Sequence, residues 1–88
     1  MLRLTRTTRL PYEAVLIVEG QIVAEWVGLL EEECLDLLGT GQKVFLDLAG
    51  VSYLDRRAVR LLRELAARSV ALINCPPLVD DLVREDAP

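Results

Sequence analysis

The chain has 88 residues, of which 52% are hydrophobic and 27% charged, and its formal net charge is −4. This length provides for one hydrophobic core, so it predicts a single domain over residues 1–88. The apolar content argues against a disordered chain. The acidic balance disfavours nonspecific nucleic-acid binding, and no specific nucleic acid is expected as a partner.

The composition also bears on cofactors, location and catalysis. The chain has no histidine and only two cysteines, Cys34 and Cys75, outside any metal-binding spacing, so no metal or cofactor is expected. Cys34 and Cys75 are interpreted as small apolar residues. No stretch reaches the roughly 20 apolar residues of a membrane span, and no signal core follows the first arginines, which predicts a cytoplasmic location.

The first half of the chain predicts two strands and a helix. Residues 2–7 alternate leucine with arginine or threonine, as in an edge strand with one wet face. Residues 14–18 form a continuous apolar run, which is typical of a strand buried on both faces, and 21–23 resume it briefly after Gly20. Residues 24–38 show the helical period, and Gly39 is expected as a left-handed C-cap. The predicted apolar stripe of this helix consists of Trp26, Val27, Leu30, Cys34, Leu37 and Leu38.

The second half predicts two further strands and two helices. Residues 43–48 indicate a buried strand that ends near Asp47, whose carboxylate is expected to bind loop amides. A short approach over 51–54 leads to Asp55, a natural N-cap for a helix to about residue 68. Its predicted apolar face consists of Ala58, Val59, Leu61, Leu62, Leu65 and Ala66. Residues 70–73 indicate a third buried strand, and Pro76-Pro77 start a helix over about 77–84.

The predicted order is therefore β-β-α-β-α-β-α. Strands that alternate with helices favour an α/β fold with a mixed, mostly parallel sheet of four to five strands, covered by helices and joined by right-handed crossovers. The first two strands can pair as a hairpin.

The segment KVFLDLAGVSYLDRRAVRLL, residues 43–62, resembles the central signature of the STAS family. That family includes anti-sigma-factor antagonists and cytoplasmic domains of sulphate transporters. Its buried strand ends in an Asp and is followed by a VxxID-S-S-G loop that opens a helix. The matching positions here are Asp47, Val51, Ser52, Leu54 and Asp55. The resemblance implies the same β-β-α-β-α-β-α fold over nearly the whole chain.

The chain departs from this family at the residues that regulate it. In the antagonists the second serine of the loop accepts phosphate from a partner kinase, whereas Arg56 and Arg57 occupy both serine positions here and Ala58 replaces the glycine. The resemblance implies a non-catalytic protein-interaction domain in bacterial signalling or transcription regulation, with a kinase-like anti-sigma factor or another signalling protein as partner. The altered loop predicts no serine switch there. The alternative is a stand-alone STAS subunit that regulates the ATPase of a membrane transporter.

Arginines are concentrated in the helix predicted over 56–68. Cations in a first helical turn are unfavourable by about 0.3–1 kcal/mol each, so Arg56 and Arg57 do not serve helix stability. One interpretation is a solvated face in which Glu64 pairs with Arg60 or Arg68. The other is a surface for an acidic or phosphorylated partner; self-association through the acidic helix over 24–38 is a competing use of the same charges. The predicted partner-binding residues are Ser52, Asp55, Arg56, Arg57 and Arg60.

No arrangement of residues indicates catalysis. A chain without histidine lacks the usual general base, and no serine or cysteine lies in an activating motif. Asp47 and Asp55 could form a carboxylate pair, but a strand-end and a capping role are expected instead. The sequence therefore predicts a protein that is not an enzyme.

Overall fold

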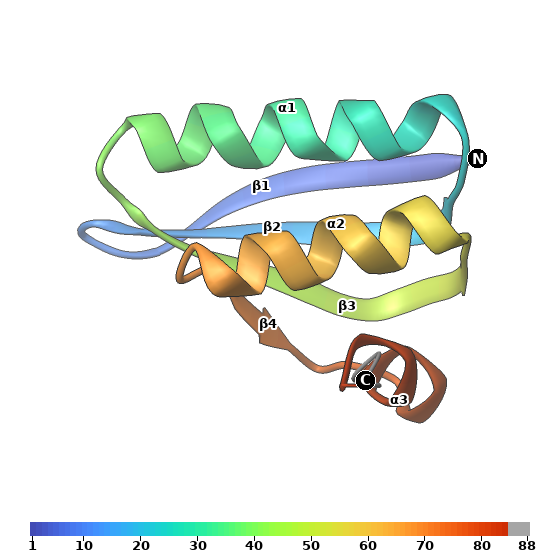
Figure 1. Ribbon diagram of the computed structural model, residues 1–88. Helices are drawn as coiled ribbons and strands as arrows, with labels where there is room; N and C mark the ends of the chain where they lie inside the picture. The colour runs from blue at the N-terminus through green and yellow to red at the C-terminus, as the bar shows by residue number, and fades with distance from the viewer. Residues whose placement is uncertain (85–88) are drawn as a thin grey trace.

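The computed structural model describes residues 1–84 as four strands and three helices (Figure 1). Their order is the predicted β-β-α-β-α-β-α. The bounds are β1 Leu2–Leu10, β2 Glu13–Ile22, α1 Glu25–Gly39, β3 Lys43–Leu54, α2 Arg56–Ala67, β4 Ala71–Ile73 and α3 Pro77–Arg84.

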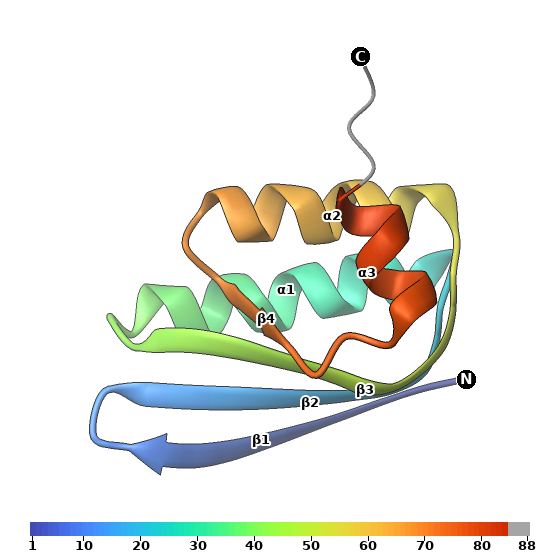
Figure 2. The ribbon, with the colours of Figure 1, turned by 90° about the horizontal axis from the view of Figure 1, so that it is seen from below.

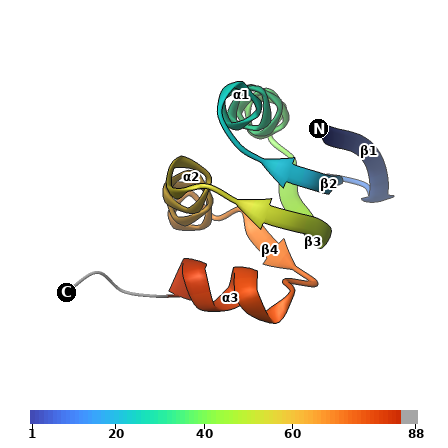
Figure 3. The ribbon, with the colours of Figure 1, turned by 90° about the vertical axis from the view of Figure 1, so that its right-hand side faces the viewer.

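The four strands lie side by side in chain order, β1-β2-β3-β4. β1 and β2 pair antiparallel as the predicted hairpin, whose turn contains Tyr12 with a φ of 70°. β2, β3 and β4 are mutually parallel. Because both parallel crossovers step the same way across the sheet, right-handed connections place α1 and α2 on the same face. Figures 2 and 3 show both helices on one side of the sheet and α3 beside α2.

The core lies between that face and the two crossover helices. Strand alternation sends Leu16 and Val18 of β2 and Leu46 of β3 inward, each with 0% exposure. The helices contribute the residues of their apolar stripes. Those buried are Val27, Leu30, Cys34 and Leu37 on α1, and Ala58, Leu61, Leu62 and Leu65 on α2. Cys34 thus acts as the small apolar residue that was predicted.

The strands differ from the predictions in burial. The expected burial of residues 14–18 on both faces holds in part. Val15 on the second face is buried, but Ile17 on the same face is only half-buried, because sequential strand order leaves that face of the sheet without a helix. β4 is a half-buried edge strand and not a buried one, because it pairs only with β3.

β3 is longer than expected because it continues through Gly50 to Leu54. The pairing of β3 with β2 shifts register twice, between Ile17 and Glu19 and between Gly20 and Gln21. The side chain of Glu19 lies against Gly50, where an added Cβ would come within 2.8 Å of the Glu19 Cγ. Asp47 is therefore inside a strand and not at its end, although its carboxylate does accept a hydrogen bond from the N–H of Ala49 at 3.1 Å.

The helix ends also differ in detail. α1 includes Gly39, which was expected to be the left-handed cap; Thr40 is the right-handed C-cap, and Gly41 takes the positive φ of 83°. The N–H of Thr40 donates to the carbonyl of Leu37 and the N–H of Gly41 to that of Leu38, each at 3.1 Å, so the helix closes one residue later than predicted. On α2, Val59 is only half-buried and Ala66 is exposed, which narrows the predicted apolar face. No helix in residues 1–84 has both the length and the apolar character to cross a bilayer.

Candidate protein-binding site

Asp55 joins the starts of the two crossover helices. It follows β3 and is the predicted N-cap of α2, with one carboxylate oxygen accepting a hydrogen bond from the N–H of Ala58 at 2.8 Å. The other oxygen accepts from the N–H of Ala24, the N-cap residue of α1, at 2.9 Å. The N–H groups of Ala24 and Ala58, in that order, lower the pKa of the Asp55 carboxyl, with a smaller contribution from the charge of Arg57.

Ala24 holds a backbone conformation that favours glycine. Its φ of 51° and ψ of −127° place an L-residue in a sparsely populated region, between Val23 and the first turn of α1. The N–H of Trp26 bonds the carbonyl of Val23 at 3.0 Å, which closes this tight turn. The bond to Asp55 therefore fixes a strained residue at the junction of α1 and α2.

Three arginines surround the first turns of α2. Arg56, Arg57 and Arg60 are exposed, and α2 has no acidic residue in its first turn. Within residues 1–84 these three side chains make no hydrogen bond or salt bridge. The expected pairing of Glu64 with Arg60 or Arg68 is also absent from this part of the chain. No hydrogen bond or salt bridge in residues 1–84 therefore engages these three guanidinium groups, although the Asp55 carboxylate lies near enough to interact with the charge of Arg57.

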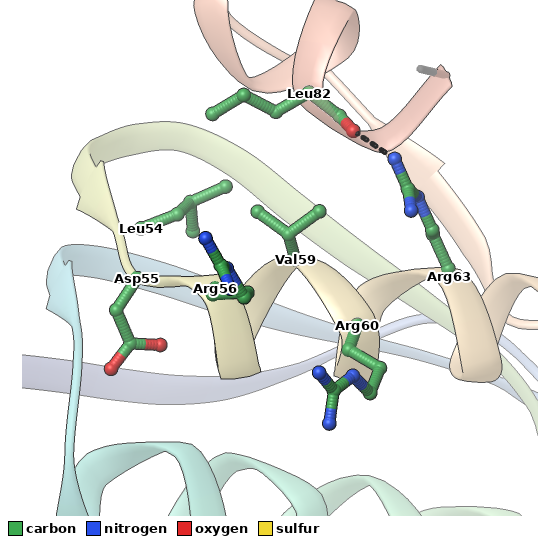
Figure 4. Close-up of a pocket in the computed structure, with 7 residues that line it drawn as sticks. All are labelled: Leu54, Asp55, Arg56, Val59, Arg60, Arg63 and Leu82. Carbon is green, nitrogen blue, oxygen red and sulfur yellow. Dashed lines mark hydrogen bonds between the residues drawn. The ribbon is translucent and has the colours of Figure 1, made fainter. Parts of the chain in front are cut away.

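A cleft of about 570 Å³ lies between α2 and α3 beside these arginines. Its apolar wall is formed by Leu54, Val59 and Leu82, and its polar lining by Asp55, Arg56, Arg60 and Arg63. In Figure 4, Arg56, Val59 and Leu54 extend toward α3, whereas Arg60 extends toward the side of α1. Arg60 also lines a shallower hollow between α1 and α2, together with Arg57, Glu31 and Glu64.

Arg63 has a structural role in this cleft. Its guanidinium donates to the main-chain carbonyls of Leu82 at 2.7 Å and Val83 at 3.0 Å, so it ties the last turn of α3 to α2 (Figure 4). Arginine near a helix C-terminus satisfies carbonyls that lack an intrahelical partner. Arg63 lies in the arginine-rich helix predicted over 56–68, but the sequence could not show that α3 folds back onto it. Leu82, whose apolar side chain completes the cleft, was not predicted.

Ser52 has a structural role and does not lie with the arginines. Ser52 lies within β3, and its hydroxyl donates to the carbonyl of Gly20 at 3.2 Å. It therefore helps hold β3 to β2. Of the predicted site residues, Asp55, Arg56, Arg57 and Arg60 come together around the start of α2, whereas Ser52 belongs to the sheet.

The two aspartates do not form a carboxylate pair. Asp47 lies on the helix-free face of the sheet, level with Ile17, while Asp55 caps α2 on the side of the helices. Among residues 1–84 no group of three potential metal ligands is found.

The acidic face of α1 is partly neutralised by β1. Arg6 pairs with Glu33 and, at 3.0 Å, with Asp36, and these two carboxylates raise the pKa of the Arg6 guanidinium. This cross-element cluster was not predicted, since nothing in the sequence shows that β1 lies beside α1.

Comparison with known proteins supports the architecture. No protein-family model and no curated protein sequence matches the chain. Among solved structures, the anti-sigma factor antagonist SpoIIAA in its unphosphorylated form superposes with a TM-score of 0.70 and 17% identity, covering 98% of this chain and 90% of that one. The fold is STAS-like. The predicted resemblance is therefore confirmed at the level of the fold.

A second solved structure is similar over part of its length. The structure described as "Crystal Structure Analysis of Mglu" has a TM-score of 0.57 and 24% identity, and the match covers 80% of this chain but 18% of that chain. At these identities both comparisons bear on the STAS-like fold alone.

Proposed function

We propose that this chain is a non-catalytic protein-interaction domain of bacterial signalling or transcription regulation, acting as anti-sigma-factor antagonists do. Its partner would be a kinase-like anti-sigma factor or a related signalling protein. The observation that carries the proposal is the group of three exposed arginines without a salt bridge at the start of α2, beside a cleft that has one apolar wall. The STAS-like fold, shared with the antagonist SpoIIAA, supports the same kind of function.

The chemistry of this surface suits an acidic or phosphorylated partner. Arg56 and Arg57 flank N–H groups of the first turn of α2, where the helix dipole adds positive potential. Guanidinium groups bind carboxylates and phosphates with paired hydrogen bonds. The wall formed by Leu54, Val59 and Leu82 can receive an apolar side chain next to that charge. Arginine beside a desolvated apolar pocket is a frequent composition of binding hot spots.

The proposed domain is not switched by serine phosphorylation in the loop before α2. Arginine occupies both serine positions of the loop, the phosphate-accepting one included, and the Ser52 hydroxyl donates to the Gly20 carbonyl inside the sheet. Incubation with an anti-sigma-type serine kinase and labelled ATP should leave the loop unlabelled. Stoichiometric label on Ser52 in peptide mapping would contradict this part of the proposal.

The experiment compares capture by the wild-type domain with capture by Arg56→Glu/Arg57→Glu. Immobilised wild type should retain a kinase-like anti-sigma factor from native lysate, and the purified pair should bind in titration. The double variant should lose that binding by at least about a hundredfold, because two charge-assisted contacts become repulsive. Arg68→Glu is the matched control, since Arg68 is exposed at the far end of α2. Retention of a transporter ATPase instead would support the alternative function.

A further inference from the structure

The sheet face opposite the helices is a surface that the proposed function leaves unused. Strand register places side chains in two rows across this face. One row runs Thr7, Val15, Phe45 and Ala71, and the other runs Thr5, Ile17, Asp47 and Ile73. None of the three helices in residues 1–84 covers it (Figure 3).

The centre of this face is apolar. Val15 is 8% exposed, and Ile17, Phe45, Ala71 and Ile73 are half-buried although no helix packs on them. An antiparallel or edge strand with one solvated face ordinarily alternates apolar and polar residues. β2 instead carries apolar residues on both faces between Ala14 and Val18. A contiguous apolar patch on a sheet is typical of an interaction surface.

Charge on the same face is distributed unequally along the strands. The guanidinium of Arg9 lies 5.3 Å, and the ammonium of Lys43 5.8 Å, from the centroid of the Phe45 ring, toward the hairpin end. Asp47 and Glu19 lie toward the other end. Glu13, level with Lys43, and Arg3, 3.9 Å from Glu19, reduce the charge at each end without reversing it. One end is therefore net basic and the other net acidic.

We propose that this helix-free face binds a second copy of the chain, sheet against sheet. A two-fold axis in the interface plane, crossing the strands at the level of Phe45, runs the strands of the two copies in opposite directions. This pairing buries the two apolar centres against each other and places Lys43 of each copy near the Asp47 of its partner. Such an interface is isologous, so each charge contact occurs twice. Two sheets packed face to face are an ordinary protein core.

The size of the face sets the expected strength. Four strands about 4.8 Å apart, with outward residues over roughly 25 Å of strand, give a face smaller than the roughly 800 Å² per partner of a standard interface. The pairing is therefore a weak dimer that depends on concentration. Sedimentation equilibrium of the full chain should show a weight-average mass that rises from 9.8 kDa toward twice that value between roughly 10 µM and 1 mM.

A charge exchange tests the proposed orientation. Lys43→Glu sets a glutamate near the partner's acidic end, and Asp47→Lys sets a lysine near the partner's basic end. Each variant alone should self-associate about tenfold more weakly than wild type, because both reciprocal contacts become repulsive. An equimolar mixture of the two variants should recover the wild-type association, since both contacts are then attractive. Arg68→Glu and Glu31→Lys, with the same charge changes on α2 and α1, should associate as wild type does.

A milder substitution distinguishes a loss of association from a loss of folding. Ile17→Thr keeps a strand-forming residue while removing an apolar group from the centre of the face, and it should lower association with an unchanged far-ultraviolet circular dichroism spectrum. Recovery in the mixture, with both controls unaffected, supports the proposed pairing. The proposal is overturned if the wild type stays monomeric throughout, even if another protein binds this face. It is overturned equally if the single charge variants associate as wild type does.

Discussion

The Asp55 carboxylate accepts one hydrogen bond from each of the two helix starts, so two substitutions of Asp55 can test the contribution of each bond to stability. Asp55→Asn leaves one acceptor oxygen, which can serve as the N-cap of α2, and places an amide group where the N–H of Ala24 needs an acceptor. Asp55→Ala removes both acceptors. The N-cap bond is worth about 1 kcal/mol and a second hydrogen bond at a partly exposed carboxylate about 1 kcal/mol. We therefore expect losses in the free energy of unfolding of about 1 kcal/mol for Asp55→Asn and about 2 kcal/mol for Asp55→Ala.

Urea unfolding followed by circular dichroism measures both changes. For a domain of this size they correspond to decreases in melting temperature of about 4–8 °C per kcal/mol. The reasoning is refuted if both variants lie within about 0.3 kcal/mol of wild type, or if Asp55→Asn loses as much as Asp55→Ala.

The same junction predicts a dependence on pH. Because the pKa of Asp55 is lower in the folded than in the unfolded chain, its carboxylate contributes fully above the unfolded pKa of about 4. That contribution disappears as the pH falls through the lower folded pKa, since a protonated carboxyl keeps only part of its acceptor capacity. The difference between wild type and Asp55→Asn should therefore shrink as the pH falls from 7 to below the unfolded pKa of about 4. A difference that is constant with pH would show that the carboxylate charge has no part in the cap.

Three further predictions concern neighbouring features. Arg56→Glu should raise the melting temperature by a few degrees, because a carboxylate interacts favourably with the helix dipole. Arg57→Glu should raise the melting temperature less, because the charge of Arg57 stabilises the Asp55 carboxylate. Equal increases in differential scanning fluorimetry would contradict this reasoning. Ala24→Gly should stabilise the chain by about 1 kcal/mol in urea unfolding because it relieves the positive φ, and a destabilised variant would show that the turn carries no strain. Burial, and to a smaller extent the charge of Glu33, raises the pKa of the Cys34 thiol to about 12. A maleimide at pH 7 should therefore modify Cys34 only in denaturant. Rapid labelling of Cys34 in the native protein would place it outside the core.

Local signals in the sequence determined the order of elements and most of the core. The three- and four-residue spacing of Leu30, Cys34 and Leu37 suffices for α1, because a helix buries one stripe. Likewise Asp55 before an amphipathic run suffices for an N-cap, since its bond to Ala58 spans three residues. The exposed arginines of α2 follow from the same helical period. These features depend on contacts within about one turn, which is why the sequence alone contains them.

Tertiary structure decided everything that joins residues distant in the chain. The bond from Ala24 to Asp55 spans 31 residues, and the bonds from Arg63 to the end of α3 close the cleft that Leu82 completes. Sequential strand order put both crossover helices on one face and left Ile17 and Phe45 on the other, although an apolar run predicts burial on both faces. An apolar run in the sequence shows only that a strand is hydrophobic. Only the direction in which each crossover returns to the sheet determines which face the helices cover.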